Sequence, residues 1–171
     1  MRAWVALGSN LGDRWASLAR AARALRAAPG VAVLRASSVW DTEPVGPPQP
    51  RYLNAVLELE TTRPPASLHR LLQEVERAAG RRREVRWGAR TLDLDLLLCG
   101  DVAVRTPALT VPHPELARRR FVLQPLAELC PERVVPGGAG AGGGPAVDRT
   151  VAALLAAAPP LGLARAGAFP L

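Results

Sequence analysis

The stretch YLNAVLELETTRPPASLHRLLQEVERAAG, residues 52–80, joins a strand pattern to a helix pattern. In residues 52–60 leucine or alanine occupies every odd position, and this alternation is typical of a β-strand. Pro64 and Pro65 then precede a run whose apolar residues recur at helical spacing, and Gly80 suits the end of that helix. A strand followed directly by a helix predicts a mixed α and β fold.

The segments before and after this pair continue the pattern. The sequence predicts, in order, a buried strand at 3–7, a turn at 8–10, a helix capped by Asp13 and stopped at Pro29-Gly30, and a strand at 31–40. Residues 41–50 form a proline-rich loop, and residues 91–98 (TLDLDLLL) form a further strand. The order strand–helix–strand–strand–helix–strand is the ferredoxin-like βαββαβ plan of the α+β class.

The last third of the chain adds less regular segments. Residues 115–129 predict a helix broken at Pro125, and residues 149–157 predict a final Ala/Leu helix. Between them, residues 137–144 (GGAGAGGG) read as a flexible glycine-rich loop. The chain has 171 residues, and too few follow this tract to make a second domain, so we expect a single domain over 1–171.

The charge composition excludes several kinds of chemistry. All 22 lysine-or-arginine positions are arginine. The absence of lysine excludes a P-loop, a protein-kinase core and Schiff-base catalysis. A net charge of +7 points to an anionic partner, either nucleic acid or a polyphosphate. Two cysteines, Cys99 and Cys130, cannot build a disulfide framework, and we expect both to be small buried residues of a reducing, cytoplasmic environment.

The alternating string at residues 91–96 (TLDLDL) carries the sharpest chemical signal. On a strand, Asp93 and Asp95 point to one face and the leucines to the other. Two carboxylates about 7 Å apart repel each other unless a cation lies between them, and a pair of Mg²⁺ ions fits that gap. The alternative is that both aspartates are paired with nearby arginines.

An arginine-rich segment, residues 80–90, lies directly before this strand. Its guanidinium groups suit phosphate oxygens, and the glycines near its two ends suit a lid that closes on a polyphosphate. The alternative is a solvated basic loop. Further along, flanking prolines hold His113 in an extended loop, where it could donate to a phosphate or have only a structural role.

The even positions of residues 52–60 form the polar side of the predicted strand. Tyr52 offers an aromatic face and Asn54 an amide that can pair with a flat heterocycle, so together they suit a planar ligand. Ordinary sheet packing is the alternative explanation for both residues.

These segments, taken together and in this order, resemble one enzyme family. They read ALGSNLGDR (6–14), TEPVGPPQPRYLNAV (42–56), WGARTLDLDLLL (87–98), LTVPHPEL (109–116) and RRFVLQPLAEL (119–129). The family is the 6-hydroxymethyl-7,8-dihydropterin pyrophosphokinases of folate biosynthesis. The resemblance implies transfer of the β,γ-pyrophosphoryl group of ATP to the pterin hydroxymethyl oxygen. It also implies a ferredoxin-like fold with an antiparallel sheet and helices on both faces.

The resemblance also implies roles for individual residues. Asp93 and Asp95 would hold two Mg²⁺ ions, and Arg81 and Arg90 would steady charge in the transition state. The residues implied at the ATP site are Gln73, Glu76, Arg83, Arg86, Trp87, Leu96, Thr110, His113 and Arg119. The residues implied at the pterin site are Thr42, Val45, Tyr52, Asn54 and Phe121.

Two other functions compete with this one. A basic ferredoxin-like domain could bind RNA, but aromatic residues make up only 4% of the chain and the aromatic signature of an RNA-recognition motif is absent. A magnesium-dependent nucleotide transferase with another acceptor would share the ATP site. We therefore expect small-molecule substrates, no nucleic acid and no membrane partner, and a monomer in the cytoplasm.

Overall fold

The computed structural model describes residues 1–80, 90–136 and 148–170. No helix in these three ranges is both long and apolar enough to cross a bilayer. In chain order the elements are β1 (Arg2–Ser9), α1 (Arg14–Ala27), β2 (Val31–Ala36), β3 (Val39–Thr42), β4 (Tyr52–Thr61), α2 (Pro65–Ala78), β5 (Asp93–Cys99), β6 (Val104–Arg105), β7 (Thr110–Val111), the 3₁₀ turn η1 (Leu116–Arg118), α3 (Arg120–Leu129), β8 (Val134–Val135), β9 (Arg149–Thr150), α4 (Val151–Ala157) and β10 (Leu163–Gly167).

The main sheet has the predicted ferredoxin-like order. Within the described residues it contains six strands in the order β10-β3-β4-β1-β5, with β2 also paired to β4, and every pairing is antiparallel. Strands β1 and β4 are therefore central, and β5 lies at one edge. The α+β prediction is confirmed.

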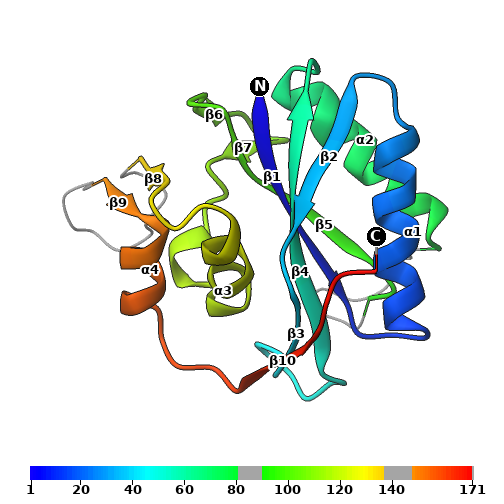
Figure 1. Cartoon of the computed structure of the whole chain (residues 1–171), viewed down its shortest axis with the longest axis vertical. Helices are drawn as coiled ribbons and strands as arrows, with labels where there is room; N and C mark the ends of the chain where they lie inside the picture. The colour runs from blue at the N-terminus through cyan, green and yellow to red at the C-terminus, as the bar shows by residue number, and fades with distance from the viewer. Residues whose placement is uncertain (81–89, 137–147, 171) are drawn as a thin grey trace.

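Two hydrophobic cores, one on each face, make the molecule three layers thick. One core packs β1, β4 and β5 against α1 and α2, through residues such as Leu18, Leu57 and Leu72. The other packs the opposite face against α3 and α4, through residues such as Val56 and Leu126. Figure 1 shows α1 and α2 on one side of the sheet and α3 and α4 on the other.

The second core changes the expected character of β4. Its even positions were predicted to form a polar side, yet Val56 is fully buried and Glu58 is only 3% exposed. Arg2 and Arg35 each approach the Glu58 carboxylate to 2.5 Å, which compensates the buried charge. The alternation therefore marks two buried faces, because α3 and α4 cover the second one.

The ends of several elements differ from the sequence predictions. β1 continues through Gly8 and Ser9, which were predicted to be a turn, because both residues pair with β4. The strand predicted at 31–40 is two strands, β2 and β3. They are separated at Ser37, whose backbone N–H donates to the Val56 carbonyl and whose hydroxyl accepts from the Val56 N–H. The Asp13 cap is confirmed, since its carboxylate accepts from the Ala16 N–H at 2.9 Å.

The predicted break at Pro125 is wrong. α3 runs from Arg120 to Leu129 with Pro125 inside it, and the interruption comes earlier, at Arg119, between η1 and α3. Pro125 is buried, although a proline inside a helix cannot donate the usual backbone hydrogen bond. α4 begins at Val151 after a Thr150 cap.

Candidate active site

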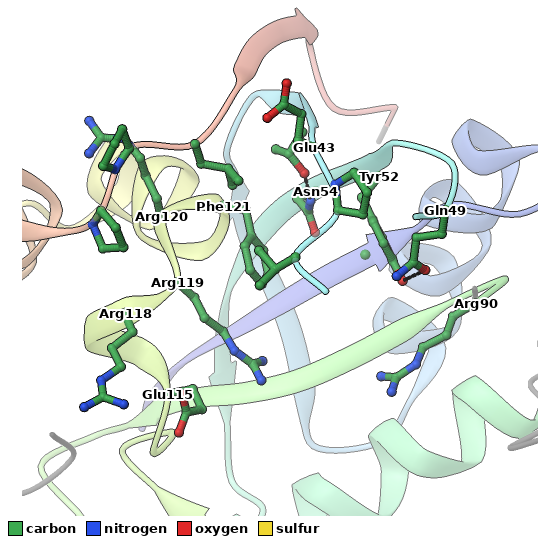
Figure 2. A pocket seen from close by; sticks show the side chains of 17 residues that line it. Glu43, Gln49, Tyr52, Asn54, Arg90, Glu115, Arg118, Arg119, Arg120 and Phe121 are labelled. Atoms are coloured by element: carbon green, nitrogen blue, oxygen red, sulfur yellow. Dashed lines mark hydrogen bonds between the residues drawn. The ribbon is translucent and has the colours of Figure 1, made fainter. Parts of the chain in front are cut away.

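A cavity of about 550 Å³ lies between the end of the sheet and α3. Its lining residues come from the central strands, the proline-rich loop, η1, α3 and the segment after α4, and Figure 2 shows them. They are Gly8, Thr42, Glu43, Pro44, Val45, Gln49, Tyr52, Asn54, Arg90, Glu115, Arg118, Arg119, Arg120, Phe121, Pro159, Pro160 and Leu161. All five residues expected at the pterin site are among them.

Gly8 is the central member of a row across three strands. It is the pairing partner of Asn54 on β4 and of Asp93 on β5. A Cβ at Gly8 would stand 3.0 Å from Asn54 Oδ1 and 4.0 Å from the Asp93 Cβ. The glycine therefore keeps open the space between the amide of Asn54 and the carboxylate of Asp93.

The amide of Asn54 is held in one orientation. Its Nδ2 donates to the Thr42 hydroxyl at 2.7 Å, and both side chains are buried. Because the nitrogen is used, the amide oxygen is the atom directed toward Gly8. In Figure 2 Asn54 is seen between Phe121 and Tyr52. The arrangement offers a hydrogen-bond acceptor and aromatic faces to a flat ligand.

A chain of hydrogen bonds connects the tyrosine side of the cavity to Arg90. The Tyr52 hydroxyl donates to Gln49 Oε1 at 3.1 Å, and Asn10 Nδ2 donates to the same oxygen at 3.0 Å. Asn10 Oδ1 in turn accepts from the Arg90 N–H at 2.7 Å. Neither Asn10 nor Gln49 was a predicted site residue, because Asn10 was interpreted as part of a turn and Gln49 as part of a loop.

Both aspartates of β5 are paired with arginine. Arg90 Nη1 lies 2.6 Å from Asp93 Oδ2, and Arg119 Nη1 lies 3.3 Å from Asp95 Oδ2. The aspartate side chains are 24% and 33% exposed. Arg119 also places its guanidinium carbon 5.8 Å from the centre of the Phe121 ring, which links the acidic pair to the cavity wall.

His113 stands beside the same acidic pair. Its Nε2 is 3.8 Å from Asp95 Oδ2, and its Nδ1 accepts from the Glu115 N–H at 3.1 Å, so the proton of the neutral ring lies on Nε2. Burial lowers the pKa of His113, while the Asp95 charge acts in the opposite direction. The backbone N–H of His113 donates to the Leu97 carbonyl and fixes the loop against β5.

Glu76 reaches the acidic strand from α2. Its side chain is 4% exposed, and its Oε1 accepts from the Leu94 N–H at 2.7 Å. Because β5 is an edge strand, this bond satisfies a donor that has no neighbouring strand, and it fixes the backbone between Asp93 and Asp95. Gln73, one turn earlier, has its Nε2 3.0 Å from the Nε2 of His69.

A family model for 7,8-dihydro-6-hydroxymethylpterin pyrophosphokinases (HPPK) matches residues 4–131. This chain belongs to that family. The matched span runs from within β1 to just past α3, and it contains Asp93, Asp95, Arg90 and Arg119. It ends before α4 and β10, so the segment of the cavity wall at 159–161 lies beyond it.

Curated relatives of this chain have names that place them in the same family. The chain is 46% identical over 129 residues to 2-amino-4-hydroxy-6-hydroxymethyldihydropteridine pyrophosphokinase of Bacillus subtilis, covering 75% of this chain and 77% of that protein. It is 42% identical over 138 residues to the protein of the same name from Pseudomonas aeruginosa, covering 80% and 85%.

The fold is also that of a solved member. The structure of Plasmodium falciparum HPPK-DHPS with pterin and p-hydroxybenzoate superposes with a TM-score of 0.63 at 12% identity. The match covers 91% of this chain and 42% of that one, so this chain spans less than half of the Plasmodium protein. At 12% identity, this similarity is evidence for a shared fold alone.

The remaining predicted HPPK residues lie in different environments. Thr110 begins β7 beside the His113 loop and is half-buried. The Leu96 side chain is 2% exposed and lies in the core under α1 and α2, on the face opposite Asp95. Val45 lines the cavity with 58% of its surface exposed. Four further residues lie outside the described ranges: Arg81, Arg83, Arg86 and Trp87.

Proposed function

We propose that this chain transfers the β,γ-pyrophosphoryl group of ATP to the hydroxymethyl oxygen of 6-hydroxymethyl-7,8-dihydropterin, releasing AMP, as a step of folate biosynthesis. The observation that carries the proposal is the row Asn54–Gly8–Asp93. This row places a cavity suited to a flat heterocycle directly beside the carboxylates of Asp93 and Asp95. Membership of the HPPK family supports the same reaction.

The acceptor would lie between Tyr52 and Phe121. Asn54 Oδ1 can accept from an amino or ring N–H of the pterin, because the bond from its amide nitrogen to Thr42 directs this oxygen toward Gly8. Val45 would cover the ring from the proline-rich loop. Burial of a planar ring among these side chains fixes its orientation, so that the hydroxymethyl group can point along the row toward Asp93.

Asp93 and Asp95 fit magnesium by the chemistry of their donor atoms. Carboxylate oxygens are preferred Mg²⁺ ligands, and Mg²⁺ sites with one or two protein carboxylates complete their shell with water and substrate phosphate. We propose that Asp93 and Asp95 would hold two Mg²⁺ ions, which would supply positive charge beside the phosphates.

The arginines and His113 would then act on phosphate. Arg90 and Arg119 lie 2.6 and 3.3 Å from the aspartates, and a guanidinium beside this carboxylate pair is suited to form charge-assisted hydrogen bonds with phosphate oxygens. Neutral His113 can donate from Nε2. Glu76, Gln73 and Thr110 would position the nucleotide side of the site, together with Arg81, Arg83, Arg86 and Trp87 and the backbone of Leu96.

No general base is needed in this scheme. Phosphoryl transfer is catalysed mostly by positioning and by stabilisation of charge. We propose further that the protein acts in the cytoplasm, as a monomer, on small-molecule substrates.

The deciding experiment is AMP release from ATP and Mg²⁺, with and without 6-hydroxymethyl-7,8-dihydropterin. Pterin-dependent AMP without ADP would establish the proposed transfer. ATP binding with no AMP in the presence of the pterin would refute the acceptor and leave the nucleotide site standing.

A further inference from the structure

Part of the cavity wall comes from a segment that the family model does not cover. Pro159, Pro160 and Leu161 connect α4 to β10, and all three line the cavity. In Figure 1 this segment runs from the end of α4, past α3, to the edge of the sheet at β10. We call residues 159–161 the C-terminal wall.

The C-terminal wall is fixed at its first end by α3. Arg120, itself a cavity residue, donates from Nη1 to the Ala158 carbonyl at 3.0 Å and to the Leu155 carbonyl at 3.4 Å. Both carbonyls lie at the C-terminal end of α4, and the Leu155 carbonyl also accepts from the Ala158 N–H at 3.3 Å. Ala158 is 7% exposed and belongs to the second core. The wall therefore begins from a buried, hydrogen-bonded position.

The other end is fixed to the edge of the sheet. The Glu43 N–H donates to the Gly162 carbonyl at 2.9 Å, and Leu163 then pairs with Thr42 in the β10–β3 ladder. Thr42 is the residue that orients Asn54. The wall is thus connected through one strand pair to the polar edge of the same cavity.

Gly162 lies directly against the Glu43 side chain. A Cβ there would overlap the Glu43 carboxylate. Arg51 holds that carboxylate from the other side, with Nη1 3.5 Å from Glu43 Oε1, and also donates to the Gly162 carbonyl at 3.4 Å. A side chain at Gly162 would displace the Glu43 carboxylate, whose side chain is 56% exposed, from this contact.

We propose that the C-terminal wall, and Leu161 in particular, determines acceptor specificity. The inference rests on the proposed function. Prolines offer no N–H and Leu161 only an alkyl group, so this side of the cavity is apolar where Asn54 and Thr42 are polar. Of the three wall residues Leu161 is the half-buried one, whereas both prolines are exposed. The wall limits the width available to the ring and rejects pterins that carry extra bulk on that side.

The test compares Leu161→Ala with Leu155→Ala. Leu155 lies on α4, packs on the second core and does not line the cavity, so its truncation is a matched control for lost stability. We expect Leu161→Ala to raise the pterin KM about three- to tenfold with kcat and the ATP KM nearly unchanged, since it removes buried apolar contact from the acceptor alone. It should also raise the relative kcat/KM for a pterin with an added alkyl substituent. Leu155→Ala should change neither the pterin KM nor the relative kcat/KM for the substituted pterin.

A second variant and a binding assay keep the result decisive. Leu161→Trp should raise the pterin KM as well, because its larger side chain narrows the cavity that Leu161 lines. Binding of 6-hydroxymethylpterin, followed by its fluorescence, measures the same effect without turnover. If the pterin Kd is unchanged in both variants, the C-terminal wall does not determine acceptor specificity, even if the wild-type chain forms AMP. If the wild-type chain binds the pterin but forms no AMP, the proposed function is refuted. The pterin Kd of Leu161→Ala would still show whether the C-terminal wall contributes to pterin binding.

Discussion

Asn10 and Arg90, 80 residues apart in the chain, are joined by two hydrogen bonds. The Asn10 backbone N–H donates to the Arg90 carbonyl at 3.0 Å, and the Arg90 N–H donates to Asn10 Oδ1 at 2.7 Å. Asn10 is 3% exposed and also donates to Gln49 and to the Pro50 carbonyl. One buried amide therefore holds together the end of β1, the loop before Tyr52 and the backbone of a proposed catalytic arginine.

We expect Asn10→Ala to lower kcat and stability together. It removes three side-chain hydrogen bonds and leaves buried donors and acceptors unpaired, which costs about 1–3 kcal/mol for each unsatisfied group. Gln49→Ala is the matched control, because it cuts the link to Tyr52 and preserves the bonds to Arg90. Steady-state kinetics should show a fall in kcat for Asn10→Ala and a rise in pterin KM for Gln49→Ala. Equal effects on pterin KM, with unchanged kcat in both variants, would exclude a positioning role toward Arg90.

Arg90→Ala tests whether the guanidinium acts mainly in the transition state. The backbone bonds to Asn10 remain in this variant, and only the contact with Asp93 and the charge are lost. We expect kcat to fall by roughly 10²- to 10³-fold while the ATP Kd changes by less than about tenfold. Arg63→Ala is the control, since Arg63 bonds the Pro29 carbonyl away from the cavity. A loss of ATP affinity with kcat preserved would make Arg90 a ground-state clamp instead.

The central elements of this fold could be predicted because their side-chain periodicity is strong. Leu57 and Leu59 alternate along β4, and Leu68 and Leu72 repeat at helical spacing along α2; all four are fully buried in one core. Asp93 and Asp95 could be predicted as a pair for the same reason. A period of two places both carboxylates on one face of β5, where Arg90 and Arg119 meet them.

The features that escaped prediction depend on contacts far apart in the sequence. β10, with the sequence LARAG, contains few strand-favouring residues and exists because its backbone pairs with β3. Glu58 has the alternation of a solvent-facing residue and is buried only because α3 covers that face. The C-terminal wall depends on Arg120 and Gly162, which no local pattern connects to Asn54.

Burial of Cys130 makes stability depend on pH in the alkaline range. Desolvation raises the pKa of its thiol to about 12, compared with 9.0 for an ordinary cysteine. The unfolded chain therefore releases this proton at lower pH than the folded chain. We expect the free energy of unfolding to be unaffected by this group below about pH 9 and to fall between about pH 9 and pH 12.

Urea denaturation at several pH values measures this dependence. Cys130→Ala should show a shallower alkaline decline than the wild-type chain, and a residual slope should remain because burial also raises the pKa of Cys99. Parallel curves for the two proteins would contradict the assignment to Cys130.

Asp95→Asn tests the proposed magnesium role with the smallest change of shape. The amide keeps the volume of the carboxylate and removes its charge, so the fold should persist while Mg²⁺ affinity and turnover fall. We expect kcat to fall by about 10²- to 10³-fold, the loss typical when one group that stabilises transition-state charge is removed. Asp101→Asn is the matched control, because the Asp101 side chain is 94% exposed and pairs with Arg133, and neither residue lines the cavity. Rates measured across a Mg²⁺ titration, with thermal denaturation in parallel, separate the two effects. If Asp95→Asn reaches nearly wild-type turnover at saturating Mg²⁺, Asp95 pairs with Arg119 for structural reasons and holds no catalytic ion.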